Sequence, residues 1–459
     1  MPDKAVLILA AGLGTRMKSD IPKVLHTFDN KPLIIRLLEK IEKLKIKNII
    51  IVVGYKAEFV VDVVKKWNAN KGFNIVFVYQ KLLKGSGQAV VESAKEIKKF
   101  EDIFIISGDI PLISLKTLKG MLRNYDNKKI DALILTATVS DTKSYGRIIR
   151  DNNKNVKAIV EADELKGDEK LINEINGGVY IFKTKKLLEA IRDLKPKGLK
   201  KEYYLTDAIE NIYKSGGKID TFIISDEDEI SGPNSKKELN ELEKRYYMKN
   251  AIKLGEEGVS IKSPEFSYIS ETVEIARDTI IYPDTHIYGN SKIGKNCSIG
   301  PYVIIEDSII KDNCTIKPFS YISKSVIREG SIVGPFSHIR PESDIGPDAK
   351  IGNFSEIKKS KIGKGSKVPH LSYIGDCEMG EKVNIGAGTI TCNYDGVKKH
   401  KTTINSGAFI GSNTNLVAPV RIGKNALIGA GSTITIDIPD NKLAIARSRE
   451  VIKEKKRKV

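Results

Sequence analysis

The stretch IARDTIIYPDTHIYGNSKIGKNCSIG, residues 275–300, decides the fold of the second half of the chain. An isoleucine stands at every sixth position from Ile275 to Ile299, and the fourth residue after each one is small or β-branched. Short extended segments joined by tight turns at this period predict a parallel β-helix of hexapeptide repeats. We expect the isoleucines to point inward and the small residues to occupy the corners.

The same period returns further along the chain. Aliphatic residues six positions apart run without a break from Ile404 to Ile434. Shorter runs fill the middle, at Ile339, Ile345, Ile351 and Ile357 and at Ile362, Val368 and Ile374. The interruption TCNYDGVKKHKTT at 391–403 is too polar for a core, and predicts a loop on the binding face. The β-helix is expected to cover 258–459 and to end in a basic tail.

Residues 1–228 follow a different pattern, in which apolar runs alternate with amphipathic segments. Near-continuous Val, Ile, Leu and Phe predict strands of a largely parallel sheet buried by helices on both faces. These runs are 5–11, 48–53, 74–79, 102–107 and 131–137, and residues 31–46 between them predict a helix. We expect a Rossmann-like α/β domain over 1–228. A helical linker follows at 229–257, where Ser235 and Glu238 have capping-box spacing.

The composition, 41% hydrophobic and 29% charged, is that of a globular protein. No apolar stretch approaches the roughly 18 residues of a membrane helix, so no membrane insertion is expected. The first apolar run predicts a strand and not a signal peptide.

Four cysteines without CxxC spacing favour a reducing cytoplasm over a disulfide scaffold or zinc site. The net charge of +18 would attract nucleic acid, anionic lipid or phosphorylated small molecules, and the lack of interleaved basic and aromatic residues argues against nucleic acid.

A glycine-rich turn, LAAGLGTRMKSDIPK at 9–23, directly follows the first predicted strand. Gly12 and Gly14 allow the backbone to approach a phosphate, and Arg16 and Lys23 add positive charge. The spacing is neither that of a dinucleotide-binding turn nor that of a P-loop. Further along, Asp109 ends another predicted strand, where an α/β sheet presents its ligands.

The motif GxGTRM…PK, together with ISGDIPL at 106–112, resembles the signature of sugar-1-phosphate nucleotidyltransferases. By this resemblance Arg16 and Lys23 neutralise the charge of a triphosphate, and Asp109 and Asn234 hold Mg²⁺. The resemblance also implies contacts to UTP and the sugar nucleotide from Leu9, Ala10, Ala11, Gly12, Gly14, Gln80, Gly85, Ser86, Gly146, Glu161, Asn176 and Thr206.

The segments HIRPES, KIGNFSEIKKSKIGKGSKVPHLSYIGD and VNIGAGTITCNYDG resemble the acetyltransferase half of the bifunctional N-acetylglucosamine-1-phosphate uridyltransferases, and the match runs through both halves in order. The resemblance implies a left-handed β-helix, a homotrimer, and acetyl transfer from acetyl-CoA to glucosamine 1-phosphate before uridylyl transfer. It makes His370 the general base, oriented by Glu356. It assigns the sugar phosphate to Arg340, Lys358, Tyr373, Asn384 and Lys399, and acetyl-CoA to Ala387, Asn393, Tyr394, Ser412, Ala430 and Arg447.

Ser107, Gln88, Gly178 and Pro369 depart from the family's usual pattern, which leaves open how strict the chain is for glucosamine and for UTP.

Three other classes of protein are alternatives to a bifunctional enzyme. A single-function nucleotidyltransferase with a structural β-helix is disfavoured by the set His370, Glu356 and Asn384. A zinc β-helix needs three convergent imidazoles, and the central coils hold two histidines. A nucleic-acid-binding protein rests on net charge alone.

Overall fold

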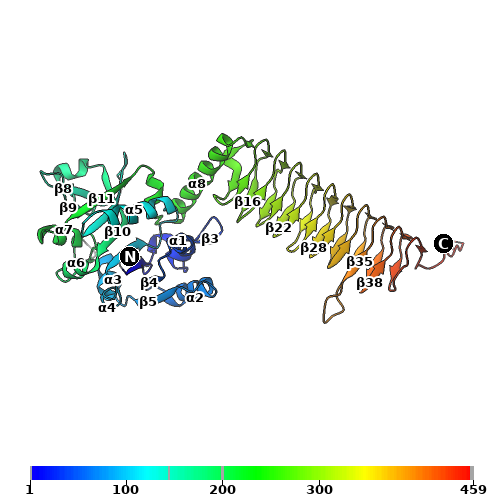
Figure 1. The fold of residues 1–459 in the computed structure, drawn as a ribbon, viewed down its shortest axis with the longest axis horizontal. Helices are drawn as coiled ribbons and strands as arrows, with labels where there is room; N and C mark the ends of the chain where they lie inside the picture. The colour runs from blue at the N-terminus through cyan, green and yellow to red at the C-terminus, as the bar shows by residue number, and fades with distance from the viewer. Residues whose placement is uncertain (1–2, 143–144, 198–200, 455–459) are drawn as a thin grey trace, which may run out of the picture. The chain divides into compact units, whose positions relative to one another are not determined.

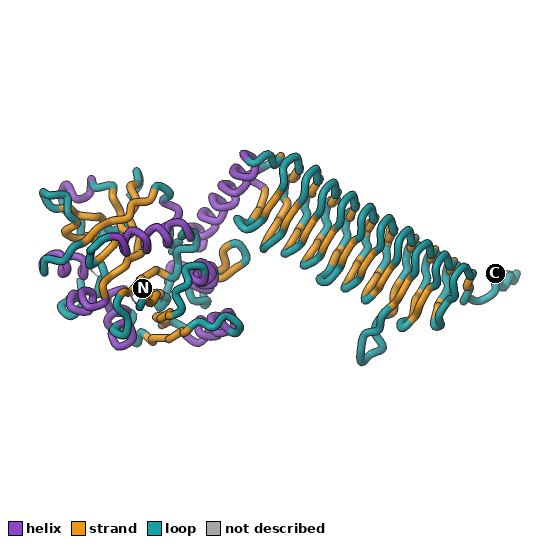
Figure 2. Tube along the Cα trace, viewed as in Figure 1, coloured by secondary structure: helices purple, strands orange, loops and turns teal. Residues whose placement is uncertain are grey.

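The computed structural model describes residues 3–142, 145–197 and 201–454. The chain divides into two compact units, Met1–Glu243 and Lys244–Val459. The first is an α/β unit and the second a β-helix, as Figures 1 and 2 show. The fold class expected from the sequence is thus confirmed for both halves of the chain.

A nine-stranded sheet forms the centre of the first unit, and its main path runs β11–β7–β10–β6–β1–β4–β5. Neighbours along this path pair in parallel, except that β10 is antiparallel to β6 and β7. A hairpin of β8 and β9 extends from β10. The strands are β1 Lys4–Leu9, β4 Asn48–Val53, β5 Asn74–Tyr79, β6 Asp102–Ser107, β7 Ala132–Thr138, β8 Arg147–Arg150, β9 Val156–Val160, β10 Glu174–Lys183 and β11 Ile219–Ile224, with a small separate pair of β2 Thr27–Phe28 and β3 Lys31–Pro32.

Helices cover both faces of this sheet, because successive residues of a strand point to opposite sides. In β1, Val6 and Ile8 belong to one apolar cluster and Ala5 and Leu7 to the other. The first cluster includes side chains of α1 (Leu33–Glu42), α2 (Ala57–Asn68) and α5 (Leu115–Asn127). The second includes side chains of α3 (Ser86–Glu92), α4 (Ala94–Ile97), α6 (Thr184–Ala190) and α7 (Asp207–Lys214).

Two details of the first unit differ from the sequence expectation. The run 74–79 was expected to be buried on both faces, yet Val76 and Tyr79 are 40% and 56% exposed. The reason is that β5 ends the path of the sheet and pairs only with β4. The helix expected over 31–46 ends at Glu42, and Lys45 then takes a left-handed φ of 64° that no α-helix continues.

The second unit is a left-handed β-helix with three parallel sheets of 11, 10 and 9 strands. The first sheet contains β12 Ser260–Ile261, β15 Ile280–Ile281, β18 Ser298–Ile299, β21 Thr315–Ile316, β24 Ile332–Val333, β27 Lys350–Asn353, β30 Lys367–His370, β33 Asn384–Ile385, β36 Phe409–Ile410, β39 Leu427–Ile428 and β41 Leu443–Ala444. The second contains β13 Ser267–Ile269, β16 Thr285–Tyr288, β19 Ile304–Glu306, β22 Tyr321–Ser323, β25 His338–Ile339, β28 Glu356–Lys358, β31 Tyr373–Gly375, β34 Ile390–Cys392, β37 Asn415–Val417 and β40 Thr433–Ile434. The third contains β14 Glu274–Ile275, β17 Lys292–Ile293, β20 Ile309–Ile310, β23 Val326–Ile327, β26 Asp344–Ile345, β29 Lys361–Ile362, β32 Cys377–Met379, β35 Thr402–Ile404 and β38 Val420–Ile422.

The interior of this unit is one continuous aliphatic column. Ile281, Ile287 and Ile299 have no exposed surface, and the repeat isoleucines of later coils are buried in the same cluster. The inward orientation expected from the period of six is therefore confirmed.

The corner residues have a second role besides being small. The hydroxyls of Thr279, Ser331 and Ser366 donate hydrogen bonds of 2.7 Å to backbone carbonyls of the next coil. A buried backbone carbonyl needs such a partner, so the hydroxyls stabilise the corners. Cys297 and Cys314 lie buried in the same kind of position as free thiols. The interruption between β34 and β35 forms a loop that projects from the coils (Figure 1), with Tyr394 and Lys399 paired across it.

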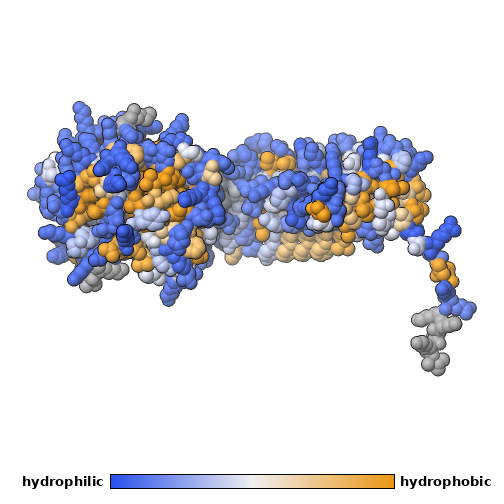
Figure 3. Space-filling view, turned by 90° about the horizontal axis from the view of Figure 1, so that it is seen from below, coloured by the Kyte–Doolittle hydropathy of each residue, from blue (hydrophilic) through white to orange (hydrophobic). Residues whose placement is uncertain are grey.

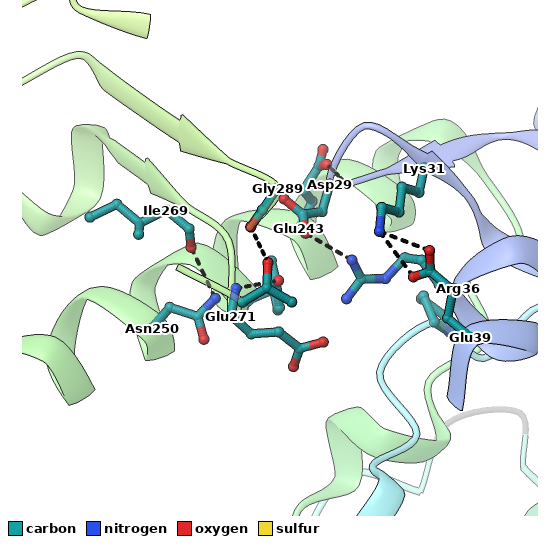
Figure 4. Close-up of polar contacts among 12 residues, drawn as sticks. Asp29, Lys31, Arg36, Glu39, Glu243, Asn250, Ile269, Glu271 and Gly289 are labelled. Atoms are coloured by element: carbon teal, nitrogen blue, oxygen red, sulfur yellow. Dashed lines mark hydrogen bonds and ion pairs between the residues drawn. The ribbon is translucent and has the colours of Figure 1, made fainter. Parts of the chain in front are cut away.

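Helix α8, Lys236–Glu256, contains the division between the two units. At its start the backbone N–H of Glu238 donates to Ser235 Oγ at 3.2 Å. Figure 4 shows the contacts of its two halves: Glu243 accepts from the Asp29 N–H within the first unit, and Asn250 donates to the carbonyl of Ile269 within the second. In the described part of the chain, no helix is long and apolar enough to cross a membrane.

We predict a large difference between two substitutions in neighbouring residues of β19. Ile305 is fully buried and Ile304 is 41% exposed. Ile305→Ala leaves a cavity in the aliphatic column and is expected to lower the free energy of unfolding by about 2–5 kcal/mol. Ile304→Ala is expected to lower it by less than about 1 kcal/mol. Guanidinium titration followed by circular dichroism measures both, and equal losses would contradict the assignment of the core.

Candidate functional site

A pocket of about 640 Å³ opens at the carboxyl ends of β1 and β6 in the first unit. Ligands of open α/β sheets bind at this edge. Twelve of the residues expected to contact UTP, metal or phosphate line it together: Leu9, Ala10, Ala11, Gly12, Gly14, Arg16, Lys23, Gln80, Gly85, Ser86, Asp109 and Asn234.

The glycine-rich turn is shaped by close packing and by backbone conformation. Gly14 has a left-handed φ of 58°, and a Cβ at this position would lie 3.0 Å from Lys23 Cβ. Next to Gly12 there is open space within the pocket lining. The turn therefore brings Lys23 beneath its backbone and leaves its other side free for a phosphate.

Three side chains from distant parts of the sequence meet at the floor of this pocket. Lys23 Nζ donates to Asp109 Oδ2 and, at 2.9 Å, to Asn234 Oδ1. Ser107 Oγ donates to the other carboxylate oxygen of Asp109 at 2.7 Å. Burial raises the pKa of Asp109, but the charge and hydrogen bond of Lys23 together with the Ser107 hydroxyl outweigh it and leave that pKa below its usual range.

Asp109 and Asn234 offer a carboxylate and a carboxamide oxygen to one point, where a cation of the protein already lies. Oxygen ligands of this kind are those that Mg²⁺ prefers, so the pair fits a magnesium ion that keeps several waters. The start of α8 fixes Asn234, since its backbone N–H donates to Glu238 Oε2 at 2.9 Å. Among the described residues there is no group of three or more His, Cys, Asp or Glu arranged for a metal.

The segment at residues 80–87 forms a tight wall of the pocket. Gln80 Nε2 donates to the carbonyl of Gly85 at 3.1 Å, and Ser86 Oγ accepts from the Leu205 N–H at 3.1 Å. Gly85 has a φ of 94°, and a Cβ there would lie 2.5 Å from the Tyr203 carbonyl. Only glycine fits this position. Because it has no Cβ, the turn between β5 and α3 can pack closely against the segment that precedes α7.

Four further residues expected to bind the sugar nucleotide do not line this pocket but contact one another. Thr206 Oγ1 donates to Glu161 Oε1 at 2.8 Å, and the Asn176 N–H donates to the Gly146 carbonyl at 2.9 Å. A Cβ on Gly146 would lie 3.5 Å from Glu161 Oε2. Burial raises the pKa of Glu161, which favours its protonated form more than in water.

Sequence reasoning missed several residues of the pocket lining. Leu13, Val24, Leu83 and Ala89 are apolar and carry no chemical signal, while Thr15 lies inside the recognised turn. Ser107 was noted only as a departure from the family pattern, yet its hydroxyl binds Asp109. Its position directly after a buried strand was the available signal.

A cluster of positive charge lies on the second sheet of the β-helix and its loop. The close approach of Lys399 lowers the pKa of Lys358, with desolvation and Arg340 acting in the same direction. Arg340 Nη1 donates to Glu356 Oε1 at 2.6 Å, and Glu356 is paired in register with Tyr373 of the next coil. Crowded cations of this kind suit an anionic ligand such as a phosphate.

Three of the residues expected to hold acetyl-CoA, Ala387, Ser412 and Ala430, lie at one corner of successive coils. Ile385 pairs with Ile410 and Ile410 with Ile428, so the residues two positions later are stacked above one another. The Asn413 N–H donates to the Ala387 carbonyl and the Gly431 N–H to the Ser412 carbonyl, at 2.7 and 2.8 Å. This corner column, which begins at His370, continues through Ala387, Ser412 and Ala430 to the segment containing Arg447.

The partner of His370 differs from the one expected. His370 Nδ1 lies 2.7 Å from Asn353 Oδ1, whereas the carboxylate of Glu356 is taken by Arg340. The reason is topological: His370 lies on β30, whose neighbour in the first sheet is β27 with Asn353, while Glu356 lies on β28 in the second sheet.

Asn393 also lies elsewhere than expected, among the residues assigned to the sugar phosphate. Its Nδ2 is 2.5 Å from Asp376 Oδ2 and 3.4 Å from the hydroxyl of Tyr373. Tyr394 is 60% exposed on the loop, where its hydroxyl donates to the Gly396 carbonyl. Asn384 is half-buried on β33, in register with Lys367.

Comparison with protein families assigns each half separately. The nucleotidyl transferase family model matches residues 5–228. In the β-helix, the model of the GMPPB C-terminal domain matches residues 268–343, and the model of the bacterial transferase hexapeptide (six repeats) matches residues 401–435.

Relatives match the whole chain and not only its parts. The bifunctional protein GlmU of Carboxydothermus hydrogenoformans is 46% identical over 448 residues, which cover 98% of each chain. The protein of the same name from Thermotoga maritima is 46% identical over 456 residues, covering 98% of this chain and 99% of the relative. That of Thermoanaerobacter pseudethanolicus is 45% identical over 454 residues, covering 99% and 97%. With both halves aligned at this identity, the chain belongs to the family of bifunctional GlmU proteins.

Proposed function

We propose that the chain makes UDP-N-acetylglucosamine in two reactions, and that residues 1–228 and 258–459 each carry one of them, with 229–257 as the connection. The single observation that carries the proposal is that one chain holds both a pocket with the Lys23–Asp109–Asn234 group and a β-helix with His370 on one sheet and a cluster of cations on the adjoining sheet and loop. Bifunctional relatives that align over 98% of this chain support it.

The first unit catalyses uridylyl transfer. An oxygen of N-acetylglucosamine 1-phosphate attacks the α-phosphorus of UTP, and the bond to the β-phosphate breaks to release pyrophosphate. Positioning and charge neutralisation supply most of the acceleration in such reactions. We assign charge neutralisation on the triphosphate to Arg16 and Lys23, and contacts with the nucleotide to the wall formed by Gln80, Gly85 and Ser86.

Asp109 and Asn234 would hold the magnesium ion in this unit. A bound Mg²⁺ supplies positive charge that lowers repulsion between the phosphates of the two substrates. The depressed pKa of Asp109 keeps the carboxylate ionised at neutral pH, as a cation site requires. Lys23, which contacts both oxygens, would then move its ammonium toward the phosphates.

The β-helix catalyses the preceding acetyl transfer. The amine of glucosamine 1-phosphate attacks the carbonyl carbon of acetyl-CoA, a C–N bond forms, and the C–S bond breaks to release CoA. His370 takes the proton that the nitrogen loses. Arg340, Lys358 and Lys399 would bind the phosphate of the acceptor. The corner column, with the backbone N–H near Ala387 facing the carbonyl oxygen, would hold the acetyl-CoA.

We further propose that the chain is a cytoplasmic homotrimer. The free cysteines suit a reducing compartment.

Four exposed aromatic side chains on successive coils support the trimer. Their ring centroids are 4.8–5.3 Å apart and each side chain is 46–55% exposed: Tyr302, Phe319, Phe336 and Phe354. We call these four residues the aromatic ridge. Figure 3 shows apolar side chains gathered along one face of the β-helix. Such a surface is of the kind that another copy covers in symmetric oligomers.

Substitution of Lys23 tests the first activity. Lys23→Met removes the cation that contacts Asp109 and Asn234, and is expected to lower the rate of pyrophosphate release from UTP and N-acetylglucosamine 1-phosphate by about 100-fold or more. Lys81→Ala, which removes an exposed cation outside the lining, is the matched control and should stay near wild type. Acetyl transfer by both variants should be unchanged, and an active Lys23→Met enzyme would contradict the assignment.

Substitution of His370 tests the second activity. His370→Ala is expected to lower CoA release from acetyl-CoA and glucosamine 1-phosphate by about 100-fold or more, because the general base is lost. A thiol reagent measures the free CoA. Pyrophosphate release in the first unit should persist and serves as the control for folding. If the wild type releases no CoA while uridylyl transfer proceeds, the β-helix is a scaffold and the enzyme has a single function.

The aromatic ridge provides a test of assembly. Wild type is expected at three times the chain mass of 50.9 kDa in size-exclusion chromatography with light scattering. Phe336→Lys combined with Phe354→Lys places charge on the ridge and is expected to shift the mass toward one chain. A trimer that survives both substitutions would move the interface to another face, and a monomeric wild type would refute the trimer.

A further inference from the structure

The contact between His370 and Asn353 joins two neighbouring coils of the β-helix. The two residues are 17 positions apart in sequence, and β27 and β30 place them side by side in register. Asn353 Oδ1 lies 2.7 Å from His370 Nδ1, a normal hydrogen-bond distance. A carboxamide oxygen only accepts, so Nδ1 carries the proton and the lone pair of the ring is left on Nε2.

The backbone around this contact leaves little room for another arrangement. A Cβ on Gly352 would lie 1.9 Å from the carbonyl oxygen of Pro369, so the residue before Asn353 has to be glycine for the two coils to approach. On the other side the Leu371 N–H donates to the Asn353 carbonyl at 3.0 Å. The residues flanking His370 are therefore fixed against those flanking Asn353.

Charged side chains near the pair do not compete for Nδ1. The paired strands carry Lys350 and Lys367, and the adjoining strand of the second sheet carries Lys358 and Glu356. The carboxylate of Glu356 is already bound to Arg340. A carboxamide oxygen in this place holds the ring through a hydrogen bond and adds no negative charge beside it.

From this geometry we infer that Asn353 is the positioning residue of the acetyl transfer: it fixes the tautomer and orientation of His370 so that Nε2 faces the amine. The inference rests on the proposed acetyltransferase function. It assigns Glu356 to a different task, the orientation of Arg340.

Two substitutions of the full-length protein separate positioning from mere packing. Asn353→Ala removes the acceptor and is expected to lower kcat for CoA release about tenfold or more, with KM values for acetyl-CoA and glucosamine 1-phosphate within about twofold of wild type. Asn353→Asp keeps an acceptor but adds a negative charge that stabilises the imidazolium. It is expected to recover much of kcat at high pH and to move the acid limb of the kcat/KM profile to higher pH.

Controls distinguish this inference from the function on which it rests. Asn415→Ala, a strand asparagine to which no role is assigned, should leave kcat unchanged, and pyrophosphate release should be normal in every variant. A wild-type kcat in Asn353→Ala, or an unmoved acid limb in Asn353→Asp, would overturn the positioning role alone. No CoA release by the wild type would instead refute the acetyltransferase itself.

Discussion

The parallel hydrogen bonding between successive coils is the interaction on which the second half of the molecule depends. Away from the coil that carries the loop, it places residues above those that lie 17 or 18 positions earlier, as between Asn353 and His370 and between Thr279 and Cys297. Strands in register stand about 4.8 Å apart. The aliphatic column and the corner hydroxyls secure this spacing, so any function built on the surface inherits the same regular geometry.

This constraint turns a functional site into columns of residues. Arg340, Lys358 and Lys399 gather on one face, while the corner column from His370 through Ala387 and Ser412 offers successive positions along an adjacent corner. A compact charged acceptor fits the first arrangement, and a long extended donor fits the second. The second arrangement begins at His370, the residue to which we assign the proton transfer. The first unit solves a similar problem differently, by collecting strand ends at one edge of a sheet.

The sequence predicted the architecture well, because the period of six and the buried strand runs are local patterns with one structural solution. It also located most of the pocket, since the glycine-rich turn and Asp109 belong to recognisable motifs. It named Glu356 and not Asn353 beside His370, because only the coil register places Asn353 next to His370 and puts Glu356 on a different sheet. The exposed side chains of β5 could not be predicted from the sequence either, because an edge strand and a central strand can have the same composition.

The crowding of cations in the β-helix has an energetic consequence. Lys399 lowers the pKa of Lys358, which means that the two ammonium groups repel each other when no anion lies between them. If a phosphate binds between these lysines, as we propose, part of its binding free energy would come from relief of a repulsion that is already present. The net charge of +18 can be understood in the same way, as the electrostatic requirement of an enzyme whose proposed substrates all carry phosphate.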